Sequence, residues 1–299
     1  MTVILTLIKR NVKLFFKDKG MFFTSLVTPG ILLALYATFL GNVYRDSFTA
    51  NLPAGFTIDE KLIGGLVSGQ LVSSILAVSC ITVSFCSNFL MVHDRANGTA
   101  KDLLISPVKV TVLSLSYYVA TLISTLLICC SSLGLCLIYI AVSGWYLSVL
   151  DIFLLLLDVI ILVLFGTALS SVINFFLSTQ GQISAVGTII SSVYGFICGA
   201  YMPIASFGEW LQKVVLFLPG TYGTSLLRNH ALGGVFREME DIGIPAEAVK
   251  GMRDTVDCNL YFSDYRFTEP VMYTILGSAV VVLVVAYVIM NIVKQKKNK

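Results

Sequence analysis

Five uncharged stretches constrain this 299-residue chain more than any other feature. Residues 20–44, 62–92, 110–150, 159–208 and 270–293 contain no Asp, Glu, Lys or Arg. Because crossing the hydrocarbon core of a bilayer takes about 20 apolar residues, the two longest stretches each have room for more than one crossing, or for a crossing and a turn. Only 12% of the residues are charged, whereas about 25% is typical of a soluble domain. The sequence therefore predicts an all-α integral membrane protein that crosses the bilayer several times.

We expect six transmembrane helices in a domain of residues 21–293. Their predicted bounds are about 21–42, 63–92, 111–141, 151–175, 182–203 and 270–293. The first 20 residues predict an amphipathic helix in the membrane interface rather than a cytosolic stub, because apolar and basic side chains follow opposite helical faces. The apolar face carries Ile4, Ile8, Val12 and Phe15, and the basic face Lys9, Lys13 and Lys17.

The segment before the last span, residues 204–269, is expected to lie outside. Its first part, residues 205–234, is mostly apolar and broken at Pro219-Gly220, which predicts a helical hairpin resting on or dipping into the outer leaflet and sheltered by protein. Residues 235–269 carry eight acids and four basic residues. We expect them to form a small external cap of undetermined role, in which Cys258 is the one cysteine reachable by a thiol reagent.

Lys and Arg set the orientation. With the N-terminus inside, the inner segments, which include the tail 294–299, hold twelve basic residues and three acids, while the outer segments hold eight basic residues and thirteen acids. This bias agrees with the positive-inside rule. Both termini are therefore predicted to be cytoplasmic.

A charged loop, residues 93–109, lies on the cytoplasmic side in this topology. It contains the stretch DRANGTAKDLLISP, which ends in a Ser-Pro pair that disfavours further helix. A short helix with an apolar patch between two spans suits docking into a groove on a cytosolic partner. From composition alone, an ordinary charged loop remains the alternative.

The loop resembles the coupling loop of the ABC-2 type exporter permeases. The residues that carry the resemblance are Asp94, Arg95, Gly98, Thr99, Leu103, Leu104, Ser106 and Pro107. The outer stretch LPGTYGTSLLRNHALGG (218–234) is also similar to that family's segment after the fifth span. The six spans, the interfacial helix and the outer hairpin match its architecture, so the resemblance covers nearly the whole chain.

The resemblance implies a permease subunit in a bacterial plasma membrane, coupled through this loop to two copies of a separate cytosolic ATPase. It also implies a second permease, as a homodimer or a heterodimer, and membrane lipid as surroundings. ATP and Mg²⁺ would be bound by the partner, and the chain itself has no Gly-Lys dipeptide and so no GxxxxGK[ST] phosphate loop. No cofactor, metal site, catalytic residue or nucleic-acid partner is predicted for this chain.

Three further features are candidate sites. Asp158 is the one charge within a span, and it is expected either to form buried hydrogen bonds or to line the translocation pathway. Ser191, Gly195 and Gly199 repeat at helical spacing and indicate a possible dimer interface. They lie in the expected fifth span, and the resemblance implies dimers that pack through the first and fifth spans. The two histidines, His93 and His230, are expected to be plain polar residues.

The expected function is export of an amphipathic or hydrophobic compound, such as a drug, an antibiotic peptide or a lipid-like cargo (multidrug-type transport). Export of a lipid-linked polysaccharide by the same type of permease is the alternative cargo. A secondary transporter or channel would need several buried charges or an inverted repeat, and a membrane enzyme would need a paired acid and base. The sequence does not fix the cargo.

Overall fold

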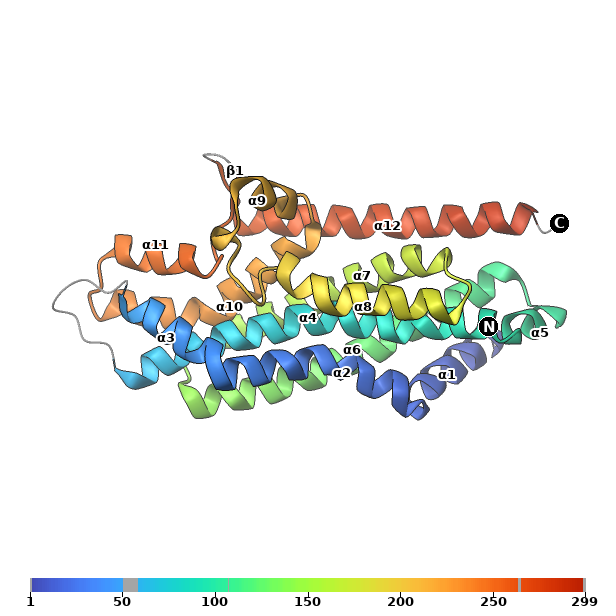
Figure 1. Cartoon of the computed structure of the whole chain (residues 1–299), viewed down its shortest axis with the longest axis horizontal. Helices are drawn as coiled ribbons and strands as arrows, with labels where there is room; N and C mark the ends of the chain where they lie inside the picture. The colour runs from blue at the N-terminus through green and yellow to red at the C-terminus, as the bar shows by residue number, and fades with distance from the viewer. Residues whose placement is uncertain (1, 51–58, 107, 263–264, 298–299) are drawn as a thin grey trace.

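The chain forms a long bundle of helices in a computed structural model that describes residues 2–50, 59–106, 108–262 and 265–297 (Figure 1). Within these ranges, five helices are long and apolar enough to cross a membrane: Lys19–Ala50, Glu60–Ala96, Val110–Ser143, Val149–Phe175 and Glu269–Lys294. The predicted all-helical class is confirmed. The helix in the position of the expected fifth span, α8 (Gln180–Ile197), is 18 residues long and runs along the bundle with the others (Figure 1).

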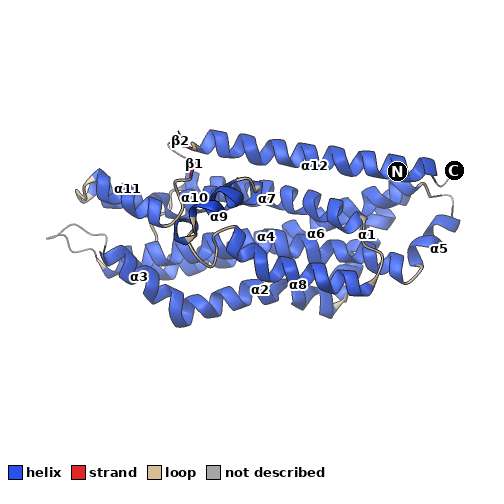
Figure 2. Cartoon of the chain, turned by 45° about the horizontal axis from the view of Figure 1, so that its top comes forward, coloured by secondary structure: helices blue, strands red, loops and turns tan. Residues whose placement is uncertain are grey.

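The remaining elements follow the order expected from the sequence. Besides α8, the helices are α1 Thr2–Lys17, α2 Lys19–Leu35, α3 Gly41–Ala50, α4 Glu60–Ala96, α5 Thr99–Ile105, α6 Val110–Ser143, α7 Val149–Phe175, α9 Glu209–Leu216, α10 Pro219–Asp241, α11 Ala246–Thr255 and α12 Glu269–Lys297. A π-helical turn, Tyr36–Leu40, joins α2 to α3, and a 3-10 turn, Ile204–Ser206, precedes α9. Two short antiparallel strands, β1 Tyr261–Phe262 and β2 Tyr265–Arg266, pair Tyr261 with Arg266 in the external segment (Figure 2).

Helix α4 is the centre of the bundle. Most of its side chains are buried, and it packs against α2, α6, α7, α8 and α10. In contrast, α12 runs along the outside of the bundle (Figure 2) and leaves most of its apolar surface uncovered, as expected for a helix that faces lipid. The sequence pattern follows this placement, since α4 carries small and hydroxyl-bearing residues where other helices approach it and α12 carries exposed valines.

The helix ends are fixed by local side-chain chemistry. Ser148 and Asp151 form a capping box at the start of α7, and Thr179 and Gln182 form another at the start of α8.

The observed ends of two spans differ from the predicted ones. The expected fifth span ran to residue 203, but α8 ends at Ile197 and an irregular segment follows. In this segment the carbonyl of Gly199 accepts a hydrogen bond from Arg228 of α10. The first span is longer than predicted because the helix continues beyond residue 42 through the π-helical turn to Ala50.

The predicted outer hairpin consists of α9 and α10, with Pro219 in the first turn of α10. Its second helix does not rest on the leaflet: residues 220–236 of α10 are buried against α4, α7 and α12. Helices α4 and α10 can approach closely because small residues lie between them. At Gly69 of α4, for example, a Cβ atom would lie only 2.5 Å from the side chain of Leu232 of α10. The shelter that its backbone needs is therefore supplied by this chain.

The external cap is packed onto the bundle rather than detached from it. Val249, Met252 and Val256 belong to the same buried cluster as the residues of α4 and α7. Cys258 is 1% exposed, and burial raises the pKa of its thiol to about 12. The expectation that Cys258 is open to a thiol reagent is therefore wrong, because a polar sequence around a cysteine does not prevent its side chain from turning inward.

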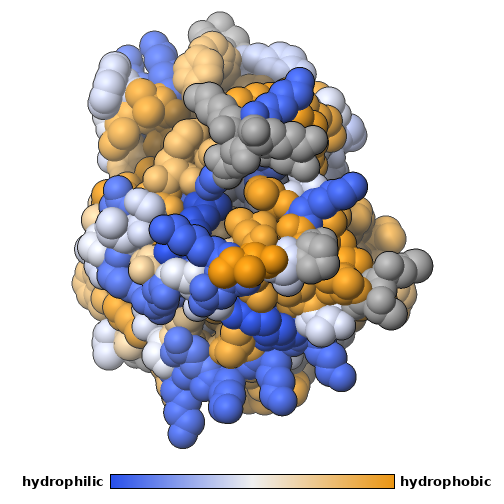
Figure 3. Space-filling view, turned by 90° about the vertical axis from the view of Figure 1, so that its right-hand side faces the viewer, coloured by the Kyte–Doolittle hydropathy of each residue, from blue (hydrophilic) through white to orange (hydrophobic). Residues whose placement is uncertain are grey.

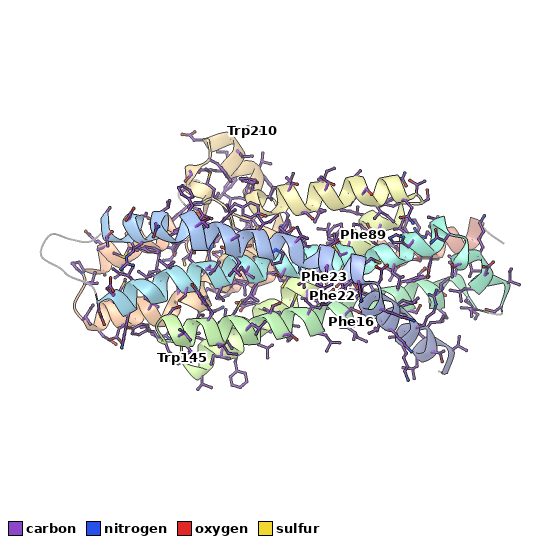
Figure 4. The ribbon with its side chains drawn as sticks, turned by 60° about the horizontal axis from the view of Figure 1, so that its bottom comes forward. Phe16, Phe22, Phe23, Phe89, Trp145 and Trp210 are labelled. Atoms are coloured by element: carbon purple, nitrogen blue, oxygen red, sulfur yellow. The ribbon has the colours of Figure 1, made fainter. Side chains whose placement is uncertain are left out.

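Two tryptophans project from the sides of the molecule in the half that carries the cap (Figure 4). Trp145 follows α6 and Trp210 lies on α9, and both side chains are well exposed. Exposed indole rings are typical of the headgroup level of a bilayer. The two indole rings are therefore suited to the headgroup region of a membrane.

Candidate functional site

The end of the bundle that is expected to lie inside, called the inner end below, is tied together at Asp94, in the last turn of α4. Its carboxylate lies 2.7 Å from Nη1 of Arg10 on α1 and accepts a hydrogen bond from the hydroxyl of Tyr117 on α6. Asn11 of α1 adds a 3.4 Å hydrogen bond to Ser116 of α6. Helix α1 therefore docks on α4 and α6 through Arg10 and Asn11 and through the buried Leu7 and Phe15. The side chains of its three lysines, Lys9, Lys13 and Lys17, stay exposed.

Arg95 points to the end of α7 rather than out of the molecule. Its guanidinium donates to the main-chain carbonyls of Asn174, Phe175 and Leu177 at 2.9–3.3 Å. A helix leaves its last carbonyls without intrahelical partners, and a cation is favoured there. Arg95 therefore joins the charged loop to the inner end of α7.

The charged loop folds into a short helix, α5, as expected. Gly98 caps its start at φ 81°, a left-handed conformation that favours glycine. Thr99 begins the helix and Ser106 ends it, while Pro107 lies outside the described residues. Figure 3 views this end of the molecule and shows an apolar area surrounded by hydrophilic side chains.

The two leucines of α5 do not share one environment. Leu103 packs on a cluster of Leu7, Met91, Leu113 and Tyr117. Leu104 is 37% exposed and Ile105 is 85% exposed. The exposed apolar surface of α5 is therefore formed by Leu104 and Ile105. Ile105 directly follows the Leu pair and belongs to the apolar patch that the sequence predicts for this helix.

A groove of about 1070 Å³ runs along the bundle between α2 and α8. Both helices pack on α4, which forms the floor of the groove with Cys86, Phe89 and His93. The groove extends from Asp18 and His93 at the inner end to Leu40 and Tyr201 at the outer end. Its walls are apolar with interspersed hydroxyls: Thr24, Val27, Thr28 and Ile31 of α2, and Ser184, Thr188, Ser191, Ser192 and Phe196 of α8.

Of the three small residues proposed for an interface, Ser191 lines this groove. Gly195 and Gly199 are buried inside the chain. A Cβ on Gly195 would lie 2.2 Å from the ring of Tyr201, and one on Gly199 would lie 3.0 Å from Asp257. Contacts within this chain thus account for both glycines. The part of α8 left open to a second copy carries Ile189 and Val193 instead.

Asp158 is fully buried between α7, α10 and α12. Its carboxylate lies 2.6 Å from Nδ1 of His230 and accepts a hydrogen bond from the hydroxyl of Tyr273. It does not line the groove between α2 and α8. The geometry favours the first of the two roles considered for Asp158, that of a buried carboxylate with hydrogen-bond partners. His230 is not a plain polar residue, because it forms the other half of this pair.

A second buried ion pair holds the cap. Arg228 of α10 lies 2.9 Å from the carboxylate of Asp257, which also accepts a hydrogen bond from the backbone N–H of Ile204. The same arginine donates to the carbonyl of Gly199. This pair connects the segment after α8, helix α10 and the cap. The one indication of this ion pair in the sequence is a lone arginine in the apolar stretch 218–234. The sequence alone does not show which residue Arg228 contacts.

Comparison with known families identifies the chain. Residues 2–231 match the family model described as ABC-2 type transporter, which covers more than half of the chain. Comparison with curated proteins finds none that matches. The membrane domain of this family typically has six spans, carries no ATPase activity and works with ABC ATPase subunits. The chain therefore belongs to the ABC-2 type transporter family, as a multi-pass membrane permease subunit.

Proposed function

We propose that the chain exports an amphipathic or hydrophobic compound by alternating access, along the groove between α2 and α8. The observation that carries the proposal is the groove itself, which follows the bundle from its inner to its outer end. Ligand sites are mostly apolar and carry a few polar groups that fix orientation. An apolar wall with a row of hydroxyls suits a drug, an antibiotic peptide or a lipid-like cargo.

The charge distribution supports this cargo class. Among the described residues that line the groove, the one carboxylate is Asp18 and the one histidine is His93, and both lie at the inner end. The middle of the groove offers threonine and serine hydroxyls but no ion. A strongly charged cargo would lose its hydration there without a compensating partner. Amphipathic molecules fit these walls better than small ions.

A second permease copy would close the open side of the groove. Exposed apolar side chains lie along it, Val27 and Ile31 on α2 and Ile189 and Val193 on α8. Exposed apolar surface of this kind in a membrane helix faces either lipid or another helix. The proposal includes a dimer of permeases, identical or not, with both termini of each chain in the cytoplasm of a bacterial cell.

The chemistry is supplied by two ATPase subunits, which bind ATP and Mg²⁺. This chain's part is mechanical. Leu104 and Ile105 of α5 would receive the ATPase, and Arg95 and Asp94 would carry its displacement to α7, α1 and α6, because they connect these helices directly. Rigid helices then shift against one another and change the side on which the groove is open.

An efflux assay with the reconstituted complex of permease and ATPase tests this proposal. Thr188→Trp would fill the groove, whereas Val282→Trp adds the same bulk on an exposed part of α12. We expect Thr188→Trp to stop ATP-dependent efflux of amphipathic dyes or peptides and Val282→Trp to leave it intact. Equal efflux by both variants would contradict the groove assignment. Movement of a lipid-linked polysaccharide, but of none of these compounds, would select the alternative cargo.

A further inference from the structure

A basic pocket lies at the inner end of the bundle, where α4, α5, α6 and α12 meet. It has a volume of about 260 Å³ and is lined by three cations: Arg95, Lys101 and Lys294. No Asp or Glu lines it. Within the described part of the chain, none of the three cations forms an ion pair. The pocket therefore holds an excess positive charge that no carboxylate among the described residues pairs with.

The contacts of these cations orient them without neutralising them. The guanidinium carbon of Arg95 lies 5.7 Å from the centroid of the Phe175 ring, and Nζ of Lys294 lies 5.0 Å from the same centroid. Cation–π contacts of this kind are favourable but leave the charge in place. Two cations held beside one ring, with a third on α5, suit an anion that accepts several hydrogen bonds.

An apolar groove of about 240 Å³ continues from this pocket between α6 and α12. Ser114 lines both the pocket and the groove, so the two are direct neighbours. At their junction the hydroxyl of Tyr287 donates to the carbonyl of Ser114 at 3.2 Å. Farther along, Leu115 and Val288 are about half exposed on the outer surface of the bundle. The groove thus opens on the side of α6 and α12 where lipid chains are expected.

The position of the pocket fits the cytoplasmic boundary of the membrane. Arg95 lies in the last turn of α4, and Lys294 is the last residue of the candidate span in α12. Figure 1 shows α5 and the C-terminal end of α12 at the same end of the molecule. Basic pockets between transmembrane helices on the cytoplasmic side are suited to anionic lipid headgroups. A phosphate beside an apolar groove is the chemistry of a phospholipid.

We propose that this composite site binds an anionic phospholipid of the inner leaflet. Its phosphate lies among Arg95, Lys101 and Lys294, and one acyl chain lies in the groove between α6 and α12. Because Lys101 belongs to α5 and Lys294 to α12, the bound headgroup joins the coupling helix to the last span. The site is separate from the groove between α2 and α8, so lipid binding and cargo export can fail independently.

Native mass spectrometry of the purified full chain tests the proposal, with phosphatidylglycerol and phosphatidylcholine as probes. We expect tighter binding of phosphatidylglycerol. Since one basic residue near a membrane surface contributes about a fivefold gain in affinity, Lys101→Gln and Lys294→Gln should each weaken it about fivefold and together about 25-fold. Lys296→Gln removes the same charge from an exposed side chain two residues along α12. It should leave the preference unchanged.

A second pair of variants tests the acyl-chain groove without changing charge. Val288→Trp fills the groove and should weaken phosphatidylglycerol binding, whereas Val285→Trp adds the same bulk to an exposed position outside it. Equal retention of both lipids by the unmodified chain would overturn the proposal. So would an equal loss in Lys294→Gln and Lys296→Gln. Binding of inorganic phosphate or glycerol phosphate as tight as that of phosphatidylglycerol would identify a soluble anion site instead of a lipid site.

Discussion

The guanidinium of Arg10 and the carboxylate of Asp94 form an ion pair 2.7 Å long between the first helix and the last turn of α4. Asp94 lies five residues before Thr99, where α5 begins. A displacement of α5 by a partner would therefore reach α1 and, through Tyr117, α6 as well. If α5 receives the ATPase as proposed above, the amphipathic helix takes part in coupling and is more than an anchor in the membrane interface.

Breaking this pair should uncouple the complex. Asp94→Ala leaves Arg10 and Tyr117 without their acceptor, and loss of a partly buried hydrogen-bond partner costs about 1–3 kcal/mol of stability. We expect transport to fall more than the ATPase rate, as measured together in reconstituted vesicles. Lys9→Ala, which removes an exposed charge one residue from Arg10, serves as the control. Equal coupling in both variants would exclude a role for the pair.

Two apolar residues of α5, Leu103 and Ile105, should separate docking of the ATPase from folding of the permease. Ile105→Ala removes an exposed side chain, so the free energy of unfolding should change by less than about 0.5 kcal/mol, while copurification with the ATPase decreases. Leu103→Ala removes a side chain packed on Met91 and Leu113. It should cost about 2 kcal/mol of stability, the low end for a core leucine, because Leu103 is only partly buried. The opposite assignment of the two effects would contradict this surface.

Asp158 should act on stability and not on cargo preference. Removing one partner from a buried ion pair costs about 3–5 kcal/mol, so Asp158→Ala should lower the thermal unfolding midpoint in detergent sharply. Asp158→Asn keeps the shape and most hydrogen bonds and should lower it less. The exposed Asp241→Asn is the control. If Asp158→Asn selectively abolished transport of cationic cargo at unchanged stability, the residue would belong to the pathway after all.

Thiol labelling of intact cells should report the orientation. Cys258 should not react with a membrane-impermeant maleimide, because its side chain is buried and its thiol stays protonated with a pKa of about 12. Glu247→Cys on the exposed side of α11 should react, and Lys101→Cys on α5 should react only after lysis. Labelling of Lys101→Cys in intact cells would reverse the proposed topology.

The sequence predicted the helices well where hydropathy alone decides their position. The uncharged stretches placed α4, α6, α7 and α12 because a bilayer requires long apolar helices. They did not place the end of α8, where the carbonyl of Gly199 accepts a hydrogen bond from Arg228, a residue 29 positions away. The uncharged stretches also did not reveal the burial of α10, because a hairpin that rests on a leaflet and one that packs inside a bundle have similar apolar sequences.

The side-chain pairs that connect the helices of this bundle cannot be predicted from sequence periodicity. Arg10 and Asp94 are separated by 84 residues, and Asp158 and His230 by 72. Helical spacing relates only residues three or four positions apart. The groove has a local signal in the sequence, because hydroxyls recur four residues apart at Thr24 and Thr28 of α2 and at Ser184 and Thr188 of α8.

The central claim is that ATP bound by a separate subunit changes the access of the groove between α2 and α8. The direct measurement is the rate at which a thiol reagent modifies Thr188→Cys in the reconstituted complex, with Cys86 and Cys130 replaced by Ala. We predict a several-fold change in this rate when ATP is trapped on the partner, and no change when Ile105→Asp is added. The same rate with and without trapped ATP, in a complex that hydrolyses ATP normally, would contradict the account.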